Sequence, residues 1–94
     1  MNNAIKQYEL TILMHEDVTD EMVQEMTEMV KGYDKNATIE DDGLKRLAYP
    51  IRDEDRARYL FYTLMLKDGE PQELSSRLNP DENVLRFLLV RTGR

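Results

Sequence analysis

The sequence contains no cysteine, and only one histidine, His15, occurs among its 94 residues. Without cysteine, the chain can form neither a disulfide framework nor a thiolate metal site, and it has no cysteine nucleophile. A lone histidine beside Glu16 and Asp17 is most simply a surface residue at the end of a strand. Glycine-rich phosphate loops, nucleophile elbows and calcium-loop spacings are also missing. We therefore predict a protein that is not an enzyme and that uses no cofactor or metal.

Long hydrophobic runs are absent as well. No apolar segment approaches the length of a membrane span, and the first eight residues show no basic region followed by an apolar stretch. We expect a soluble, cytoplasmic protein without a membrane partner. A chain of 94 residues can bury one modest core but not two, so a single domain spanning residues 1–94 is predicted.

Positive charge is scarce overall, since the formal net charge is -6. Such a balance is unfavourable for binding nucleic acid, because phosphate binding depends on neutralisation by cations. The charges are unevenly distributed, however. Residues 1–42 carry 11 acidic and 3 basic side chains, a balance of -8, whereas residues 43–94 carry 8 acidic and 10 basic ones, a balance of +2. A small basic surface on an acidic protein is compatible with RNA contact in a crowded assembly, but alone it predicts weak binding.

Alternating apolar residues predict four strands, at residues 5–14, 38–49, 58–66 and 83–91. Helical spacing predicts an amphipathic helix from residue 20 to about Gly32, with Thr19 as its N-cap and Val18 and Val23 as a hydrophobic staple. A second, short helix at residues 72–78 is expected after Pro71. Residues 52–56 contain no apolar side chain and are predicted to form an exposed loop.

The order strand, helix, strand, strand, helix, strand is typical of a ferredoxin-like α+β fold. In this fold a four-stranded antiparallel sheet carries both helices on one face. Gly43 is expected to form a bulge in the second strand. The third strand is apolar on both of its alternating faces, so the sheet face opposite the helices is expected to stay partly exposed or to be covered by a partner.

A central segment of the chain, Gly43–Ile51 with the sequence GLKRLAYPI, resembles the signature of the bacterial small-subunit ribosomal protein S6 family. Tyr8-Glu9-Leu10 near the start and residues 81–91 near the end extend the resemblance over nearly the whole chain. The family usually carries tryptophan just before the glycine, whereas this chain has Asp42. The resemblance implies the same ferredoxin-like fold, no catalytic role, and a place in the central domain (platform) of the small ribosomal subunit.

The resemblance also implies two partners, because proteins similar to this one bind small-subunit ribosomal RNA together with ribosomal protein S18. Basic and aromatic side chains on a four-stranded sheet are often used to bind RNA. The predicted RNA contacts are Lys45, Arg46, Arg56, Arg58, Arg86 and Arg91. Of these, Lys45 and Arg46 match the family's basic pair, and Arg86 and Arg91 match its last-strand cations. The predicted partner contacts are Tyr49, Tyr59, Phe61 and Phe87.

We expect the basic partner protein to cover the apolar sheet face and to offset the acidity of residues 1–42, so that the pair binds folded RNA. With Asp42 in place of the usual tryptophan, the edge of this surface lacks a large aromatic side chain.

The residues alone leave two other functional classes open, since a ferredoxin-like domain can also be a homodimeric interaction module or a small-molecule sensor. The segment from His15 to Val18 offers no polar ligand loop, and the mass in solution would identify a homodimer.

Overall fold

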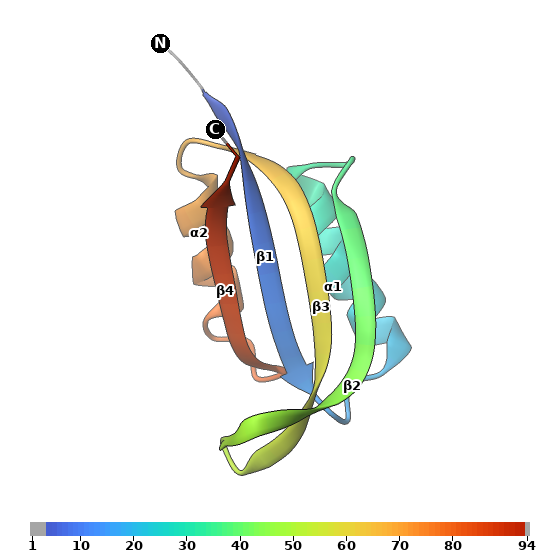
Figure 1. Ribbon diagram of the computed structural model, residues 1–94. Helices are drawn as coiled ribbons and strands as arrows, with labels where there is room; N and C mark the ends of the chain where they lie inside the picture. The colour runs from blue at the N-terminus through green and yellow to red at the C-terminus, as the bar shows by residue number, and fades with distance from the viewer. Residues whose placement is uncertain (1–3, 94) are drawn as a thin grey trace.

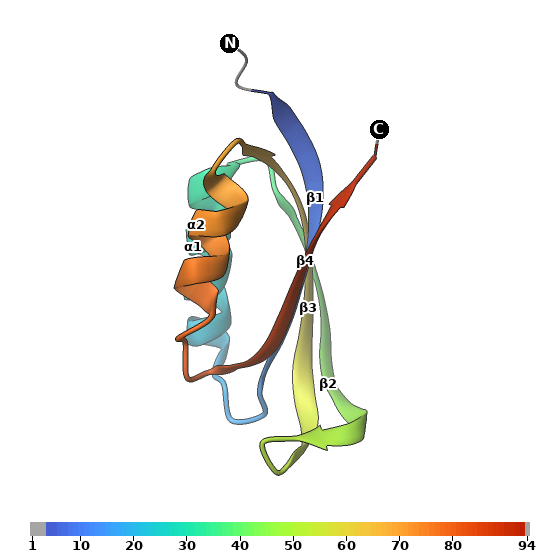
Figure 2. The ribbon, with the colours of Figure 1, turned by 90° about the vertical axis from the view of Figure 1, so that its left-hand side faces the viewer.

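The computed structural model describes residues 4–93, which form four strands and two helices. In chain order these are β1 (Ile5–His15), α1 (Asp20–Tyr33), β2 (Thr38–Ile51), β3 (Glu54–Lys67), α2 (Glu70–Leu78) and β4 (Val84–Thr92). The strands make one antiparallel sheet in the order β2-β3-β1-β4. Both helices lie against the same face of the sheet (Figures 1 and 2). The predicted ferredoxin-like α+β fold is confirmed.

The hydrophobic core lies between the sheet and the two helices. Every second residue of β1 and β3 points into this layer, because side chains alternate across a strand. The strand residues buried there are Leu10, Ile12, Met14, Leu60, Tyr62, Leu64 and Leu66, and the helices add Val23, Met26, Val30, Leu74 and Leu78. Each fully buried aliphatic side chain contributes about 1.5–3 kcal/mol relative to exposure, so this layer supplies most of the stability of the fold.

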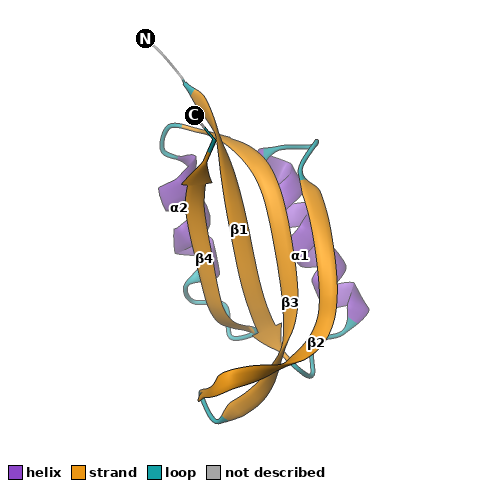
Figure 3. Ribbon diagram, viewed as in Figure 1, coloured by secondary structure: helices purple, strands orange, loops and turns teal. Residues whose placement is uncertain are grey.

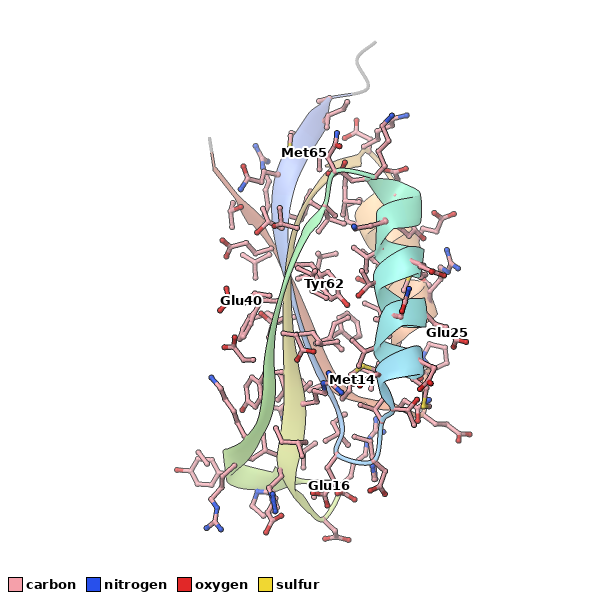
Figure 4. The ribbon with its side chains drawn as sticks, turned by 90° about the vertical axis from the view of Figure 1, so that its right-hand side faces the viewer. Met14, Glu16, Glu25, Glu40, Tyr62 and Met65 are labelled. Atoms are coloured by element: carbon pink, nitrogen blue, oxygen red, sulfur yellow. The ribbon has the colours of Figure 1, made fainter. Side chains whose placement is uncertain are left out.

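The hydroxyl of Tyr62 is a polar group inside the core. Tyr62 points from the sheet toward α1 (Figure 4), where its hydroxyl and that of Thr27 form a hydrogen bond of 3.0 Å. Burial raises the pKa of the Tyr62 hydroxyl, and the bond to Thr27 opposes that rise. The bond satisfies a polar group that would otherwise be costly to bury and fixes α1 against β3.

Both ends of α1 lie at or next to the predicted residues. Thr19 is the N-cap, and its side-chain oxygen accepts a hydrogen bond from the Met22 N–H at 3.2 Å. At the other end, the helix ends at Tyr33, one residue after the predicted Gly32, but Gly32 does not adopt a positive φ and so does not cap the helix. The carboxylate of the C-cap residue Asp34 accepts hydrogen bonds from the backbone N–H of Asn36 in the turn and from that of Met65 in β3. A carboxylate therefore organises this chain reversal in place of glycine.

The largest difference from prediction concerns residues 52–56, which do not form a loop. Only Arg52 and Asp53 form the turn, both with positive φ (52° and 64°), and β3 begins at Glu54. Two such residues are typical of the tight type I′ turn of a β-hairpin. The prediction of a loop was based on the absence of apolar side chains in residues 52–56. A solvent-exposed hairpin can form without alternating apolar residues, so this absence did not exclude a strand. Gly43 does form the predicted bulge, with φ of 75° and a register shift beside it.

The β2–β3 hairpin extends past the ends of β1 and β4 and bends toward the β4 side of the sheet (Figures 1 and 3). A second, small cluster holds its base in place on the sheet face opposite the helices. Leu47, Ala57 and Leu85 are buried in this cluster, with Leu13 and Tyr59 packed against it. The hairpin is thus an anchored projection of the sheet.

Candidate partner and nucleic-acid interface

The sheet face opposite the helices, or open face, is largely uncovered. According to the strand register, it carries Glu9, Thr11, Glu40, Phe61, Thr63, Met65, Leu88 and Val90. Leu88 is 60 % exposed, and Met65 and Val90 are also well exposed. Contiguous exposed apolar side chains on a small protein mark an interaction surface.

The open face is acidic as well as apolar. Glu9, Glu40 and Asp42 line a shallow hollow of about 380 Å³ beside Phe61. Figure 4 shows Glu40 pointing away from the helices. A hydrogen bond to Asp42, together with the like charge of that residue, raises the pKa of Glu40. A surface of this kind repels phosphate and favours a partner that presents cationic and apolar side chains.

The four aromatic residues predicted at the partner interface are not all brought together. Tyr59 and Phe61 lie side by side on the open face, with ring centroids 6.2 Å apart. Tyr49 projects from the hairpin and is 82 % exposed. Phe87 pairs with Ile12 and packs against the core on the helix side. Only Tyr59 and Phe61 therefore share the open face as one aromatic surface.

The six cations predicted to contact RNA are also divided, because β1 lies between β3 and β4 and because successive residues alternate in direction. Lys45 and Arg86 are on the open face, where the Lys45 ammonium lies 3.2 Å from Asp42 and 5.6 Å from the centroid of the Tyr59 ring. Arg91 pairs with Tyr8 on the helix side of the sheet. Arg46 and Arg56 oppose each other on the hairpin. The cations do not form one patch.

Arg58 is held by two carboxylates of the same chain. Its guanidinium donates two hydrogen bonds to the Asp41 carboxylate, at 2.6 and 3.3 Å, and a third to Asp20 at 2.9 Å. Its side chain is only 20 % exposed. The hydrogen bonds from Arg58 lower the pKa of Asp41, and those carboxylates raise the pKa of Arg58. The structure assigns Arg58 to an ion-pair network that joins β2, β3 and α1 and leaves it few donors for RNA.

Replacing Arg58 with alanine is expected to lower the free energy of unfolding at pH 7 by about 1 kcal/mol, because the pair is bidentate but partly exposed. Asp41 has a lowered pKa in the folded protein, so its contribution is present above the unfolded value of about 3.9 and is lost as the pH falls through the folded pKa. The difference between wild type and Arg58→Ala in urea unfolding should therefore shrink below about pH 4.

Arg58→Lys serves as the control for this prediction, since it keeps the charge but loses the planar fork, and it should recover only part of the stability. A wild-type advantage that stays constant from pH 7 to pH 3 would show that the Asp41 ion pair does not contribute.

One cation was missed by sequence reasoning. Arg52 lies at the hairpin turn and lines a hollow of about 200 Å³ together with Arg86 and Phe87. The prediction placed Arg52 in a loop, where its neighbours in space were undefined. A two-residue turn would have placed Arg52 at the tip of a hairpin, but its approach to the start of β4 depends on the way the hairpin bends (Figure 1).

Comparison with known proteins identifies the family. Residues 7–91 match the family model of ribosomal protein S6. The chain belongs to the ribosomal protein S6 family. The small ribosomal subunit protein bS6 of Rickettsia prowazekii is 31 % identical over 91 residues, covering 89 % of this chain and 74 % of the relative. That of Deinococcus radiodurans is 27 % identical over 92 residues, covering 93 % of this chain and 90 % of the relative.

The fold of this S6-family chain also matches a solved structure. The crystal structure of ribosomal protein S6 from Thermotoga maritima superimposes with a TM-score of 0.81 at 19 % identity and covers 95 % of this chain and 89 % of the other. Family membership makes this chain a structural component of the small ribosomal subunit, located on the ribosome in the cytoplasm as predicted. The S6 family is one of ribosomal proteins and not of enzymes. Within residues 4–93, no helix is long and apolar enough to cross a membrane.

Proposed function

We propose that this S6-family chain binds small-subunit ribosomal RNA of the central domain jointly with ribosomal protein S18, and so supports subunit assembly and translation. The observation that supports this most strongly is the character of the open face. It exposes apolar side chains such as Leu88 and carries an acidic hollow formed by Glu9, Glu40 and Asp42. A basic partner protein with apolar side chains fits both features.

The charge distribution explains why the two partners are needed together. The chain carries a net charge of -6, and several of its cations are already neutralised by its own carboxylates, as in the Arg58–Asp41 and Lys45–Asp42 pairs. Each phosphate contact adds a limited increment to affinity, and excess negative charge opposes it. A basic partner on the open face covers the acids and adds cations. The complex then binds RNA more tightly than the chain alone.

The residues divide into two groups under this proposal. Tyr59 and Phe61 contact the partner protein on the open face. The proposed RNA contacts on the hairpin are Arg46 and Arg56, while Lys45, Arg86 and Arg91 lie elsewhere on the sheet and contribute at the margins. This division differs from a single basic sheet surface, because the acidic open face is unsuited to phosphate.

The test is binding of purified chain to a central-domain RNA fragment, with and without ribosomal protein S18, at two salt concentrations. Tight binding is expected only with the partner, weaker by roughly tenfold or more at the higher salt. A Lys45→Ala/Arg46→Ala variant should bind more weakly, by at least roughly tenfold, because it loses two cations. Binding that ignores the partner, the salt and the variant, or no binding at all, would contradict the proposal.

A homodimer on the open face is less favoured than the heteromeric complex. Self-association would bring Glu9, Glu40 and Asp42 of one copy toward the same acids of another, and like charges at an interface oppose binding. The same acids make the hollow unsuited to an anionic metabolite. The solution mass of the isolated chain tests the homodimer directly, and a monomer is expected.

A further inference from the structure

The β2–β3 hairpin places two arginines directly opposite each other. Arg46 of β2 is the register partner of Arg56 of β3, so both side chains leave the same face of the hairpin. Directly opposed residues in an antiparallel pair have Cβ atoms about 4.5–5.5 Å apart, and like charges in that position are destabilising. Both side chains are solvent-exposed, so packing does not require arginine at either position.

The two arginines are poorly neutralised by the rest of the chain. Arg56 has one long ion pair, 3.9 Å to Glu16, which lies in the loop beside the hairpin (Figure 4). Over residues 4–93, Arg46 has no ion pair. Glu54, two residues before Arg56 in β3, lies 3.1 Å from His15 and forms no ion pair with either arginine. The repulsion between the two guanidinium groups is therefore largely uncompensated within the protein.

Arg58, two residues after Arg56 in β3, has a different environment. Arg58 lies opposite Leu44 and is held by both Asp41 and Asp20. This hairpin can therefore satisfy an arginine with intramolecular carboxylates. The Arg46–Arg56 pair lacks them, and an external anion placed between two guanidinium forks would remove the repulsion and accept hydrogen bonds from both.

We propose that Arg46 and Arg56 together bind one backbone phosphate of the ribosomal RNA. This inference rests on the proposed function and narrows it to a two-arginine phosphate site. The hairpin projects beyond the ends of β1 and β4 (Figures 1 and 2), so a large polyanion can reach the pair without meeting the acidic open face. Arginine pairs suit phosphate because each planar fork donates two parallel hydrogen bonds.

The first test uses the full chain in complex with ribosomal protein S18 and the central-domain RNA fragment. Arg46→Ala and Arg56→Ala should each weaken RNA binding about tenfold, and the double variant no more than about threefold further, because both side chains serve one phosphate. The slope of log affinity against log salt should fall in the double variant by one phosphate contact, about 0.7–0.9. A Lys31→Ala/Lys35→Ala variant removes the same charge from α1 and the turn after it, and should bind like wild type.

The second test needs no RNA. Arg46→Glu converts the repulsive pair into an attractive one, and no carboxylate of the described residues lies in ion-pair contact with Arg46. The melting temperature of the free protein should rise by about 1–5 °C, while RNA binding by the complex falls at least about tenfold. A lower melting temperature would overturn the claim that the pair is strained.

The outcomes distinguish this inference from the broader proposal. If the wild-type complex does not bind the RNA, the proposed function fails, and the phosphate site with it. If wild type binds and the arginine variants bind equally well, only the phosphate site is overturned. Fully additive losses with a slope change of two contacts would show two separate phosphates. Loss of binding to ribosomal protein S18 instead of RNA would show that the pair recognises protein.

Discussion

Replacing Leu10 with alanine is expected to lower the free energy of unfolding by about 2–5 kcal/mol. Leu10 lies in the central strand β1, is completely buried, and packs in the layer between the sheet and the helices. Removing three carbons there loses burial and leaves a cavity that β1, paired on both sides, cannot easily close. Urea unfolding followed by circular dichroism measures the change, and a domain of this size should unfold in one transition.

Leu88→Ala is the matched control for Leu10→Ala, because it removes the same atoms from a side chain that is 60 % exposed on the open face. The expected loss is below about 0.5 kcal/mol. Equal losses at the two positions would contradict a core on the helix side of the sheet.

Leu88→Glu is expected to have the largest effect on the proposed interface. A glutamate at this position would add a fourth carboxylate to a face that already carries Glu9, Glu40 and Asp42, and it would bury a charge when the partner docks. Affinity for ribosomal protein S18 should fall at least about 30-fold, equivalent to about 2 kcal/mol or more. Isothermal titration calorimetry with the two purified proteins measures it.

Ile39→Glu is the control for that experiment. Ile39 is also an exposed strand residue, at 40 %, but it pairs with Tyr62 and so belongs to the helix side of the sheet. Its substitution should leave the affinity for the partner within about twofold. If Ile39→Glu weakens binding as strongly as Leu88→Glu, the partner does not dock on the open face.

The fold could be predicted from the sequence because its signals are local and periodic. The alternation of apolar with polar residues follows the pleat of β1, and its apolar residues Leu10 and Ile12 are buried against the helices. The capping oxygen of Thr19 acts within one helical turn. Such features depend only on neighbours along the chain.

The arrangement of the candidate site could not be predicted in the same way, because it depends on register and strand order. Arg46 opposes Arg56 only because the register of β2 against β3 shifts between Arg46 and Ile51, before the turn at Arg52 and Asp53. Arg58 meets Asp20 across 38 residues of sequence. Neither contact can be predicted from a local pattern in the sequence.

The family match indicated which partners to expect, but it did not indicate which side chains share a face. Phe87 and Arg91 were grouped with residues of β2 and β3, yet their pairing with Ile12 and Tyr8 places them on the helix side of the sheet. The separation of β4 from β3 by β1 is a property of the strand order and is set by contacts far apart in the sequence.

The most direct test of a protein-binding open face and an RNA-binding hairpin is a two-step NMR titration of the isotope-labelled chain. Adding ribosomal protein S18 should first shift the amide signals of open-face residues such as Phe61 and Leu88. Adding the RNA fragment to that complex should then shift the signals of Arg46 and Arg56 on the hairpin. The result would contradict this division of the surface if RNA alone shifted the amide signals of the open face. In that case the amide signals of the hairpin would stay unchanged throughout the titration.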